Sequence, residues 1–484
     1  MGSPALYNEG VIHRRGFLLS GLLATRLKAQ QPILAPDIDS LHQAIRDAKP
    51  GATIIMEDRV WANAEIRLEA EGTAGNPITL RAQTPGRVVL TGTSRLRISG
   101  RHLVVDGLLF RDGGVEGDVI AFRSSSTRLA SHTRLTRCAV IDYNPPDASR
   151  DSKWVSLYGF RNRVDRCYFA GKTNLGATLV VWLPASGEPN HHWIEYNHFG
   201  RRPLLGVNGA ETIRVGDSAT SLQSSMTVVE CNYFERCNGE IEIISSKSCE
   251  NTYRWNTFSE CEGTLTLRHG NRCVVEGNTF LGGGRPQTGG VRIIGEDHRV
   301  INNYFEGLTG AGNRASIAVL NGIPDSPLNG YFQVNRALVA HNTVVQCARP
   351  LAIGVNDGAR SMAPLNCLVA NNLFSGDRSP LVELIDSRAQ IEWVGNLFHG
   401  APVGLAGMEP LLLPLELGGH GYWQPAEGSV AQGAAASQLA EVRQDLLGRD
   451  RTHPADIGCI QLQDGPLRRG RLGVAETGPG WLER

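Results

Sequence analysis

Residues 231–258 read CNYFERCNGEIEIISSKSCENTYRWNTF and contain one short signature twice, Asn-x-Phe, with its asparagines 24 residues apart. Related tetrapeptides recur along the chain as YNHF, CNYF, WNTF, GNTF, NNYF, HNTV, NNLF and GNLF. Their asparagines are Asn197, Asn232, Asn256, Asn278, Asn303, Asn342, Asn372 and Asn396, separated by 35, 24, 22, 25, 39, 30 and 24 residues. Short β-branched runs surround each signature, and strands this short bury a core only when coils stack on one another. The sequence therefore predicts an all-β chain, a right-handed parallel β-helix with an asparagine ladder at its turns.

The repeat extends from about residue 98 to 398, which favours one long domain, residues 30–410, over several smaller ones. Before it, Asp37–Ala48 (DIDSLHQAIRDA) places its apolar residues on one helical face. We expect a short helix that caps the exposed end of the first coil. Residues 411–484 lose the signature, and we expect an irregular segment packed on the last coils, with Asp456–Leu462 as a final strand.

Residues 1–29 have the pattern of a processing segment. The run HRRGFLL, residues 13–19, precedes a short apolar stretch and resembles a twin-arginine export signal. A chance Arg-Arg pair is the alternative. The apolar core is too short to span a bilayer, and no later run is long enough. We expect a periplasmic or secreted protein with no membrane insertion after signal removal.

Composition adds few constraints. Basic and acidic residues number 48 each, so any polyanion must bind a local basic patch. We expect no nucleic-acid partner, and we expect a monomer.

The ten cysteines contain no Cys-x-x-Cys, which argues against zinc. Cys237 and Cys261, like Cys249 and Cys273, are 24 residues apart, which predicts equivalent positions on adjacent coils. Stacked buried thiols are the favoured state, and disulfides remain the alternative.

Charged residues in the central coils suggest chemistry. Glu240 and Glu242 are one residue apart in an extended run, so both face one side and could share a hard cation. Lys247 follows five residues later, and Arg268 comes 268 − 247 = 21 residues after it, about one coil. Without further information these residues could equally form a solvated strand face, with Arg268 and Arg292 as a stacked arginine pair.

Several motifs in order make the functional reading more specific. They are KWVSLYG, YFAGK, NGAETIRVGDS, NGEIEIISSKS, GTLTLRHG, TGGVRIIGE and INNYFEG. Residues 152 to about 310 resemble polysaccharide lyase family 6, the alginate lyases and chondroitinase B. The departures seen are Ala210, where a second glycine is expected, and Ser246, where asparagine is common.

The resemblance assigns roles to eight positions. It implies Ca²⁺ bound by Asn208, Glu240 and Glu242. It implies Lys247 as the catalytic base and Arg268 as the acid. Residues that match positions lining the sugar groove are Arg214, His269 and Arg292.

The residue types suit β-elimination on a 4-linked uronate. The C5 proton becomes removable only when the adjacent carboxylate is neutralised, which Ca²⁺ would achieve. Lys247 must be neutral to accept the proton, and nearby cations with partial desolvation favour that form. Arginine is a poor literal proton donor, so Arg268 is expected to stabilise the departing oxygen, with a water or hydroxyl as a possible donor.

We therefore expect a calcium-dependent lyase acting on an anionic uronate polysaccharide, alginate with mannuronate-containing blocks. Arg292, one coil beyond Arg268, would suit a polymer with a carboxylate on every sugar. The alternatives are a dermatan sulfate lyase of the chondroitinase B kind and a non-catalytic carbohydrate-binding β-helix. A hydrolase on the same scaffold would need aspartates at general acid and base separation.

Overall fold

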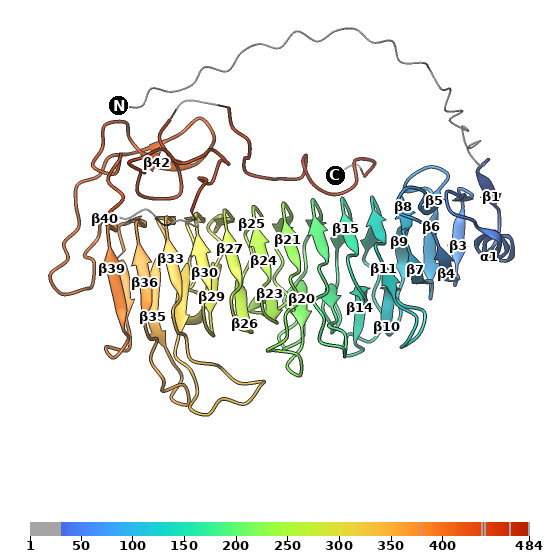
Figure 1. Cartoon of the computed structure of the whole chain (residues 1–484), viewed down its shortest axis with the longest axis horizontal. Coiled ribbons are helices and arrows are strands. Elements are labelled where there is room, and N and C mark those ends of the chain that lie inside the picture. The colour runs from blue at the N-terminus through green and yellow to red at the C-terminus, as the bar shows by residue number, and fades with distance from the viewer. Residues whose placement is uncertain (1–30, 379, 437–438, 440–441, 464–465, 483–484) are drawn as a thin grey trace, which may run out of the picture.

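The computed structural model describes residues 31–484 except 379, 437–438, 440–441, 464–465 and 483–484. The described chain is a solenoid in which three parallel sheets run along the length of the molecule (Figure 1). The predicted right-handed parallel β-helix is confirmed. The predicted export signal, residues 1–29, lies outside the described residues and stays a prediction.

Each full coil gives one short strand to each sheet. Sheet A contains, in spatial order, β1 (Ile33–Ala35), β2 (Thr53–Met56), β5 (Ile78–Ala82), β8 (Leu103–Asp106), β12 (Arg134–Thr136), β15 (Arg163–Asp165), β18 (Trp193–Glu195), β21 (Val228–Glu230), β24 (Thr252–Arg254), β27 (Val274–Glu276), β30 (Arg299–Ile301), β33 (Leu338–Ala340), β36 (Cys367–Ala370) and β39 (Ile391–Val394). Sheet B contains β3 (Val60–Ala62), β6 (Val89–Gly92), β9 (Leu109–Gly113), β13 (Ala139–Ile141), β16 (Tyr168–Ala170), β19 (His198–Phe199), β22 (Tyr233–Glu235), β25 (Thr257–Ser259), β28 (Thr279–Leu281), β31 (Tyr304–Glu306), β34 (Thr343–Val345), β37 (Leu373–Gly376) and β40 (Leu397–Gly400).

Sheet C follows sheet B in each coil and leads into the next strand of sheet A. Its strands are β4 (Glu65–Glu71), β7 (Arg95–Arg101), β10 (Gly117–Ala121), β11 (Ala130–Ser131), β14 (Ser152–Leu157), β17 (Leu179–Val181), β20 (Ile213–Gly216), β23 (Glu242–Lys247), β26 (Thr264–His269), β29 (Val291–Ile293), β32 (Ile317–Leu320), β35 (Leu351–Val355) and β38 (Val382–Leu384). A 3₁₀ turn, η1 (Gly312–Arg314), precedes β32.

The signature asparagines form the predicted ladder at the corner between sheets A and B. From Asn197 to Asn396, each side-chain Nδ2 donates to Oδ1 of the next signature asparagine at 2.9 or 3.0 Å. The residue before the asparagine is left-handed, as Cys231 (φ 54°) and Trp255 (φ 54°) are. One turn geometry therefore repeats, and every buried amide finds its partner on the neighbouring coil.

Phenylalanines of the same signature fill the interior of the coils. Ring centroids of successive residues lie 4.6–5.4 Å apart. The stacked rings are Phe169, Phe199, Phe234, Phe258, Phe280 and Phe305. Burial of this continuous apolar column supplies the cohesion that the three-residue strands lack on their own.

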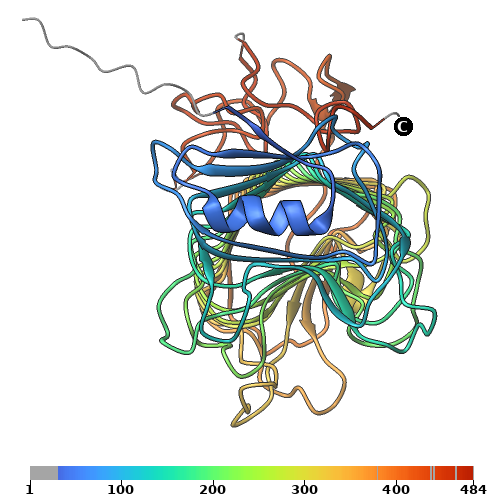
Figure 2. The same ribbon diagram turned by 90° about the vertical axis from the view of Figure 1, so that its right-hand side faces the viewer.

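The predicted capping helix is present as α1 (Ile38–Asp47), and it lies across the first coil (Figure 2). Asp37 caps it, because its side chain accepts a hydrogen bond from the backbone N–H of Ser40 at 2.8 Å. The helix buries Leu41 and Ile45 against the coil. Within the described residues, no helix is long and apolar enough to cross a membrane.

The C-terminal segment takes a longer path than predicted. After an antiparallel pair, β41 (Leu415–Leu417) and β42 (Trp423–Pro425), it runs back along the corner between sheets A and B (Figure 1). Its contacts pass from late coils to early ones: Cys459 with Thr343, Arg451 with Asn302, Leu472 with Thr257, Gly478 with Tyr196 and Trp481 with Arg137. The position expected for it, over the last coils, accounts for only part of this path.

The final strand predicted at Asp456–Leu462 is wrong. Gly458 is left-handed there, with φ 94°, which interrupts an extended backbone. The Asp456 carboxylate accepts hydrogen bonds from the backbone N–H groups of Leu462 and Gly433, at 2.6 and 2.7 Å. The segment is thus held by side-chain bonds and by single backbone bonds, such as Ile457 to Ala431 and Gly458 to Asn371, in place of a sheet ladder.

All ten cysteines are buried and unpaired. Cys237 and Cys261 occupy equivalent positions, and the Cys237 backbone N–H lies 3.4 Å from Sγ of Cys261. The matching prediction for Cys249 and Cys273 is wrong. The coil there is 22 residues long, since Thr252 pairs with Val274, and Cys273 consequently lies one coil beyond Asn251.

Candidate active site

A cavity of about 550 Å³ opens along the central strands of sheet C. Seven of the eight residues expected from the sequence line it, and Arg214 does not. The lining residues are Asn208, Ser218, Glu240, Ile241, Glu242, Lys247, Arg268, His269, Arg292, Asn313, Asn329 and Tyr331. Residues scattered over 124 positions of sequence, 208 to 331, thus meet in one place.

Lys247 and Arg268 come from adjacent strands. Lys247 ends β23, and its register partner on β26 is His269, so Arg268 lies beside it, one coil along. The Nζ of Lys247 is 3.8 Å from Oε1 of Glu211. Arg268 donates to the backbone carbonyls of Gly330 and Asn329, at 2.8 and 3.2 Å. Burial lowers the pKa of Arg268 from its ordinary value.

His269 is buried beside both of these residues. Burial, with the charges of Arg268 and Lys247, lowers the pKa of His269 to about 3. The imidazole is therefore neutral at ordinary pH, and it can donate or accept one hydrogen bond without adding charge to the cavity.

Glu240 and Glu242 lie at the entry to β23, where the chain arrives from sheet B. Glu240 accepts backbone N–H groups of Gly209 and Ala210, at 3.1 and 3.2 Å. Burial, together with the nearby carboxylates of Glu211 and Glu242, raises the pKa of Glu240 to about 7. Three carboxylates thus repel one another in a poorly hydrated space.

Glu242 has cationic partners in this structure. Arg292 donates to its Oε1, Ser245 donates to its Oε2, and Nε of Arg268 lies 3.8 Å from Oε1. Arg292 is buried, and its Nε has no hydrogen-bond partner. Arg292 could therefore exchange Glu242 for a carboxylate of a bound sugar.

The donor set fits a hard cation. Asn208 and the two glutamates offer amide and carboxylate oxygens, which are the ligands that Ca²⁺ prefers. The pKa of Glu240 is raised by burial and then by the carboxylates of Glu211 and Glu242, and a bound cation would favour its ionised form. Among the described residues no three His, Cys, Asp or Glu side chains converge on one point. A cation here would therefore need the Asn208 amide oxygen, or oxygens of a substrate, to complete its shell.

Arg214 lies one coil toward the N-terminus from these residues. It occupies β20, opposite Ser245 of β23, and its guanidinium carbon is 5.0 Å from the ring centroid of Trp182. Its Nε is buried without a hydrogen-bond partner. Arg214 thus flanks the cavity along the sheet and does not belong to its wall.

Comparisons with known proteins can now be set beside this geometry. The family model described as chondroitinase B matches residues 36–359. The chain belongs to the chondroitinase B family. No curated protein matches it.

Solved structures of polysaccharide lyase family 6 are similar to this member of the family. The alginate lyase AlyGC is 38% identical with a TM-score of 0.83, over 93% of this chain and 59% of AlyGC, so the chain spans well under two thirds of that enzyme. A mannuronic acid specific family 6 lyase from human gut microbiota is 34% identical, with a TM-score of 0.67, over 76% of this chain and 85% of its own. The family 6 lyase Pedsa3628 from Pseudopedobacter saltans is 25% identical, with a TM-score of 0.67, over 78% and 97%.

Glu211 is a residue beside the site that the sequence patterns did not predict. Its side chain is 2% exposed, its Oε1 faces Lys247 and its Oε2 has no hydrogen-bond partner. A buried carboxylate with an orphaned oxygen next to a lysine is unusual unless a ligand or cation completes it. The signal was available in the motif NGAET, which carries Glu211 three residues after Asn208.

Tyr331 was also missed. Its ring lies between two guanidinium groups, with Arg268 4.0 Å and Arg360 4.9 Å from the ring centroid. It belongs to the long connection between β32 and β33, on the edge of the solenoid opposite the C-terminal segment (Figure 2). The separation of 39 residues between Asn303 and Asn342 indicated an insertion there.

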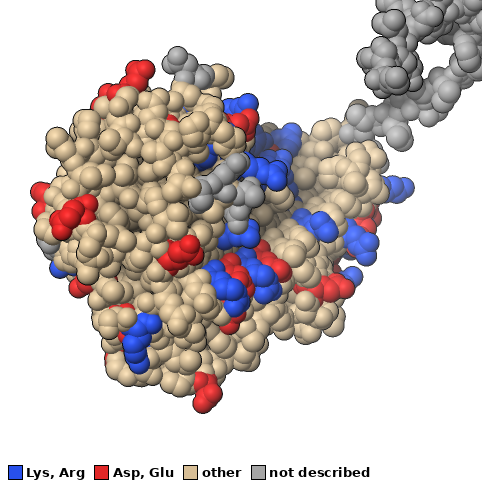
Figure 3. All heavy atoms as spheres, turned by 60° about the vertical axis from the view of Figure 1, so that its left-hand side comes forward, with Lys and Arg blue, Asp and Glu red and all other residues tan. Residues whose placement is uncertain are grey.

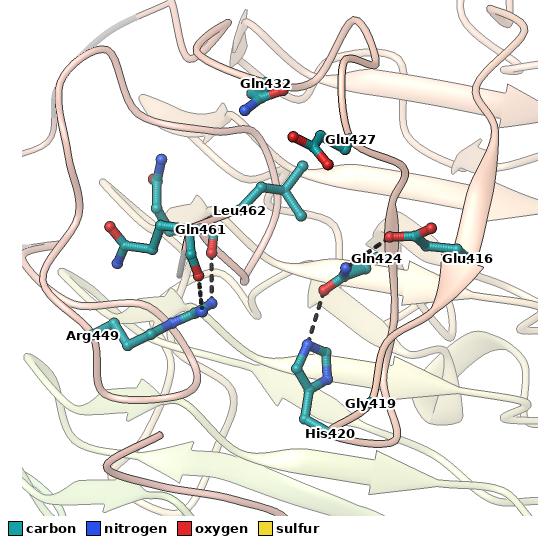
Figure 4. Close-up of a pocket in the computed structure, with 10 residues that line it drawn as sticks. Glu416, Gly419, His420, Gln424, Glu427, Gln432, Arg449, Gln461 and Leu462 are labelled. Atoms are coloured by element: carbon teal, nitrogen blue, oxygen red, sulfur yellow. Dashed lines mark hydrogen bonds between the residues drawn. The ribbon is translucent and has the colours of Figure 1, made fainter. Parts of the chain in front are cut away.

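A second cavity, of about 400 Å³, lies within the C-terminal segment. Its polar groups bond to one another, as Figure 4 shows: Gln424 accepts a hydrogen bond from His420 through Oε1 and donates one to Glu416 through Nε2. Arg449 is bound by Asp445 and by the carbonyl of Gln461. The polar groups of this cavity are thus already hydrogen-bonded within the protein. On the face drawn in Figure 3, basic and acidic side chains lie side by side.

Proposed function

We propose that this protein is a calcium-dependent polysaccharide lyase that cleaves 4-linked uronate polymers by β-elimination, with mannuronate-containing alginate as its substrate. The observation that carries the proposal is the meeting of Lys247 and Arg268, from adjacent strands, with the carboxylates of Glu240 and Glu242 in one cavity, and with Glu211 beside Lys247. A binding module would need the groove but not a lysine and an arginine placed together beside such a cluster.

Lys247 is the base that removes the C5 proton of the uronate. Among the described residues it is the only lysine that lines the cavity, and its side chain is 16% exposed, so bound sugar would exclude most remaining water. The neutral imidazole of His269 lies beside it and adds no competing charge. A positioned base of this kind contributes about 10² to 10⁴ in rate.

Arg268 faces the departing O4 oxygen in this mechanism. Its guanidinium is fixed by two backbone carbonyls and by the ring of Tyr331, so its position does not depend on substrate. A fixed cation stabilises negative charge as it develops on the leaving oxygen. The proton for that oxygen comes from water or a nearby hydroxyl.

Asn208, Glu240 and Glu242 would hold the cation. When bound, Ca²⁺ supplies positive charge that neutralises the uronate carboxylate and so acidifies the C5 proton. Arg292 would then leave Glu242 and bind a carboxylate of the substrate bidentately.

The substrate assignment rests on charge and on similarity. Arg214, Arg268 and Arg292 recur on nearby coils of sheet C, which suits a polymer with a carboxylate on every sugar. A structure 34% identical to this chain is titled as mannuronic acid specific. Dermatan sulfate is the second candidate, favoured by the family model's description as chondroitinase B.

One panel of assays tests these statements. The purified chain without residues 1–29 is given polymannuronate, polyguluronate, alternating alginate and dermatan sulfate, and unsaturated ends are read by near-ultraviolet absorbance. We expect the fastest signal from mannuronate-containing alginate, its loss on chelation and its return with Ca²⁺. Faster cleavage of dermatan sulfate would reverse the substrate, and full activity in a demonstrably metal-free preparation would remove the calcium requirement.

Export by the twin-arginine route to the periplasm or beyond, and a monomeric state, complete the proposal. A fusion of residues 1–29 to a reporter that works only after folded export would test the first. Light scattering of the purified chain would test the second.

A further inference from the structure

A column of two aromatic rings flanked by arginines leads away from the cavity along sheet C. Arg123, Tyr158 and Trp182 lie one or two residues past the ends of β10, β14 and β17, respectively. They occupy equivalent register positions on successive coils. The same position continues through Gly216 on β20 to Lys247 on β23. The column therefore ends at the proposed catalytic base.

The members of the column farthest from Lys247 are stacked on one another. The rings of Tyr158 and Trp182 are 6.0 Å apart between centroids and nearly parallel, at 9°. The guanidinium carbon of Arg123 lies 3.8 Å from the Tyr158 centroid, and that of Arg214 lies 5.0 Å from the Trp182 centroid. All four side chains are partly exposed.

Stacking leaves the guanidinium donors free. A guanidinium lying on a ring is attracted through its face, so its in-plane N–H groups still point outward. Within the described residues, neither Arg123 nor Arg214 forms an ion pair, and Nε of Arg214 is buried without a partner. Many other arginines of this chain are paired with carboxylates, such as Arg336 with Asp297 and Arg388 with Asp386.

The surrounding charges are mixed but leave these donors available. Lys153 lies 5.9 Å from the Trp182 centroid and pairs with Asp151 at 2.6 Å. Asp118 accepts from Ser156 at 2.6 Å and from the Tyr158 hydroxyl at 3.4 Å. Each of these groups is occupied, so Arg123 and Arg214 are the cations left for a ligand.

We propose that Arg123, Tyr158 and Trp182 form a distal subsite that binds carboxylated sugars of the polymer several units away from the bond that is cleaved. Arg123 binds a uronate carboxylate bidentately, the Tyr158 ring holds its guanidinium plane, and Trp182 supports that ring. Four strand steps separate Arg123 from Lys247, roughly 19 Å at the spacing of neighbouring strands. A sugar unit is about as long as one such step, so only a long oligomer reaches both. This subsite rests on the proposed function.

The test compares chain lengths. With Ca²⁺ present, kcat/KM is measured for a mannuronate trimer and octamer with the unmodified chain and with Arg123→Ala, Arg123→Lys and Arg111→Ala. Arg111, on sheet B, is the matched control. We expect Arg123→Ala to lower kcat/KM for the octamer about tenfold, as loss of a charge-assisted bidentate contact should, with the trimer unchanged. Arg123→Lys should recover little, because an ammonium lacks the planar fork.

Direct binding separates this inference from the proposed function. Calorimetry measures octamer affinity for the unmodified chain and for Arg123→Ala, with the melting temperature as a check on folding. Weaker octamer binding by Arg123→Ala without any lyase activity in the unmodified chain would support the subsite and overturn the lyase. Equal effects on trimer and octamer, or no effect on either, would overturn the subsite even in an active enzyme. If Arg123→Ala does not fold, Arg123→Lys gives the same comparison.

Discussion

The corner between sheets A and B and the cavity edge of sheet C are built from the same coils, yet they differ in how their polar groups are satisfied. At the first, asparagine amides such as Asn256 donate and accept along an unbroken ladder. At the second, buried atoms of Glu211, Thr212, Arg214 and Arg292 have no hydrogen-bond partner. A satisfied row stabilises the solenoid, while an unsatisfied one is costly unless a ligand completes it.

Coil length follows the same division. The shortest repeats are 22 to 25 residues, and longer ones place their extra residues in connections beside sheet C, such as the segment that carries Tyr331. The ladder corner keeps one turn geometry in every coil. The corner between sheets A and B thus repeats one turn in every coil, while the connections beside sheet C differ in length and residues from coil to coil.

Lys247→Ala is the change that should separate the two regions most widely. We expect kcat on alginate to fall by about 10² to 10⁴ because the base is lost, with the melting temperature unchanged. Lys247→Arg should not restore activity, since a guanidinium stays protonated. Unsaturated ends give the rate, and thermal unfolding gives the stability.

Lys49→Ala is the matched control, because Lys49 is exposed near the capping helix and far from the cavity. It should change neither quantity. Retention of more than roughly a tenth of kcat by Lys247→Ala would move the base elsewhere, with His269 next to be tested.

Asn256→Ala should give the opposite result. The change leaves the buried backbone N–H of Asn232 without its partner and removes the hydrogen bonds that the Asn256 amide donates to Asn278 and to the carbonyl of Val229, and each unsatisfied group costs about 1–3 kcal/mol. We expect a clear fall in melting temperature with kcat per folded molecule preserved. Asn76→Ala, at an exposed asparagine, should be nearly silent. A stable Asn256→Ala protein would mean that the ladder contributes little.

Much of the fold could be predicted because its signal is repeated. Each signature supplied another instance of one turn, so the ladder and the solenoid followed from Asn197 onward. The path of the C-terminal segment could not be predicted in the same way. Its contacts, such as Gly478 with Tyr196, occur once each and carry no period.

The candidate site was accessible from the sequence to a smaller extent. Lys247, Arg268 and Glu240 share one or two coils, so strand period and coil spacing place them together. Tyr331 comes from an insertion whose fold depends on what it packs against, and periodicity says nothing of it. The pairing of Arg292 with Glu242 likewise could not be predicted from the sequence, because two coils separate these residues.

Calcium binding should depend on pH through Glu240. Its pKa, raised from 4.5 to about 7 by burial and the neighbouring carboxylates, means that the folded chain holds this proton more tightly than the unfolded chain. In metal-free protein, this group favours folding below its ordinary pKa, and the contribution is lost as pH rises through about 7. Ca²⁺ binds the ionised form, so calcium affinity should rise with pH by up to about tenfold per unit below pH 7.

Glu211→Gln sharpens that measurement. Removing one negative charge lowers the pKa of Glu240, so the rise in calcium affinity should move to lower pH. Calorimetric titration with Ca²⁺ across this range, in the absence of substrate, gives both profiles. Coincident profiles for the two proteins would show that Glu211 does not act on Glu240.

Trp481→Ala should have the smallest effect. It tests whether the C-terminal segment that covers the corner between sheets A and B contributes only to stability. The indole Nε1 donates to the carbonyl of Arg137 at 2.7 Å, and the ring packs on Gly86, where no side chain could fit. Loss of one partly exposed hydrogen bond and its packing should cost about 1–2 kcal/mol locally. A solenoid unfolds in part before it unfolds as a whole, so amide hydrogen exchange near Arg137 is the sharper readout than the melting temperature. We expect faster exchange there and an unchanged kcat. A loss of kcat would instead mean that the C-terminal segment supports the cavity edge through the coils, and the division between the two regions would no longer hold.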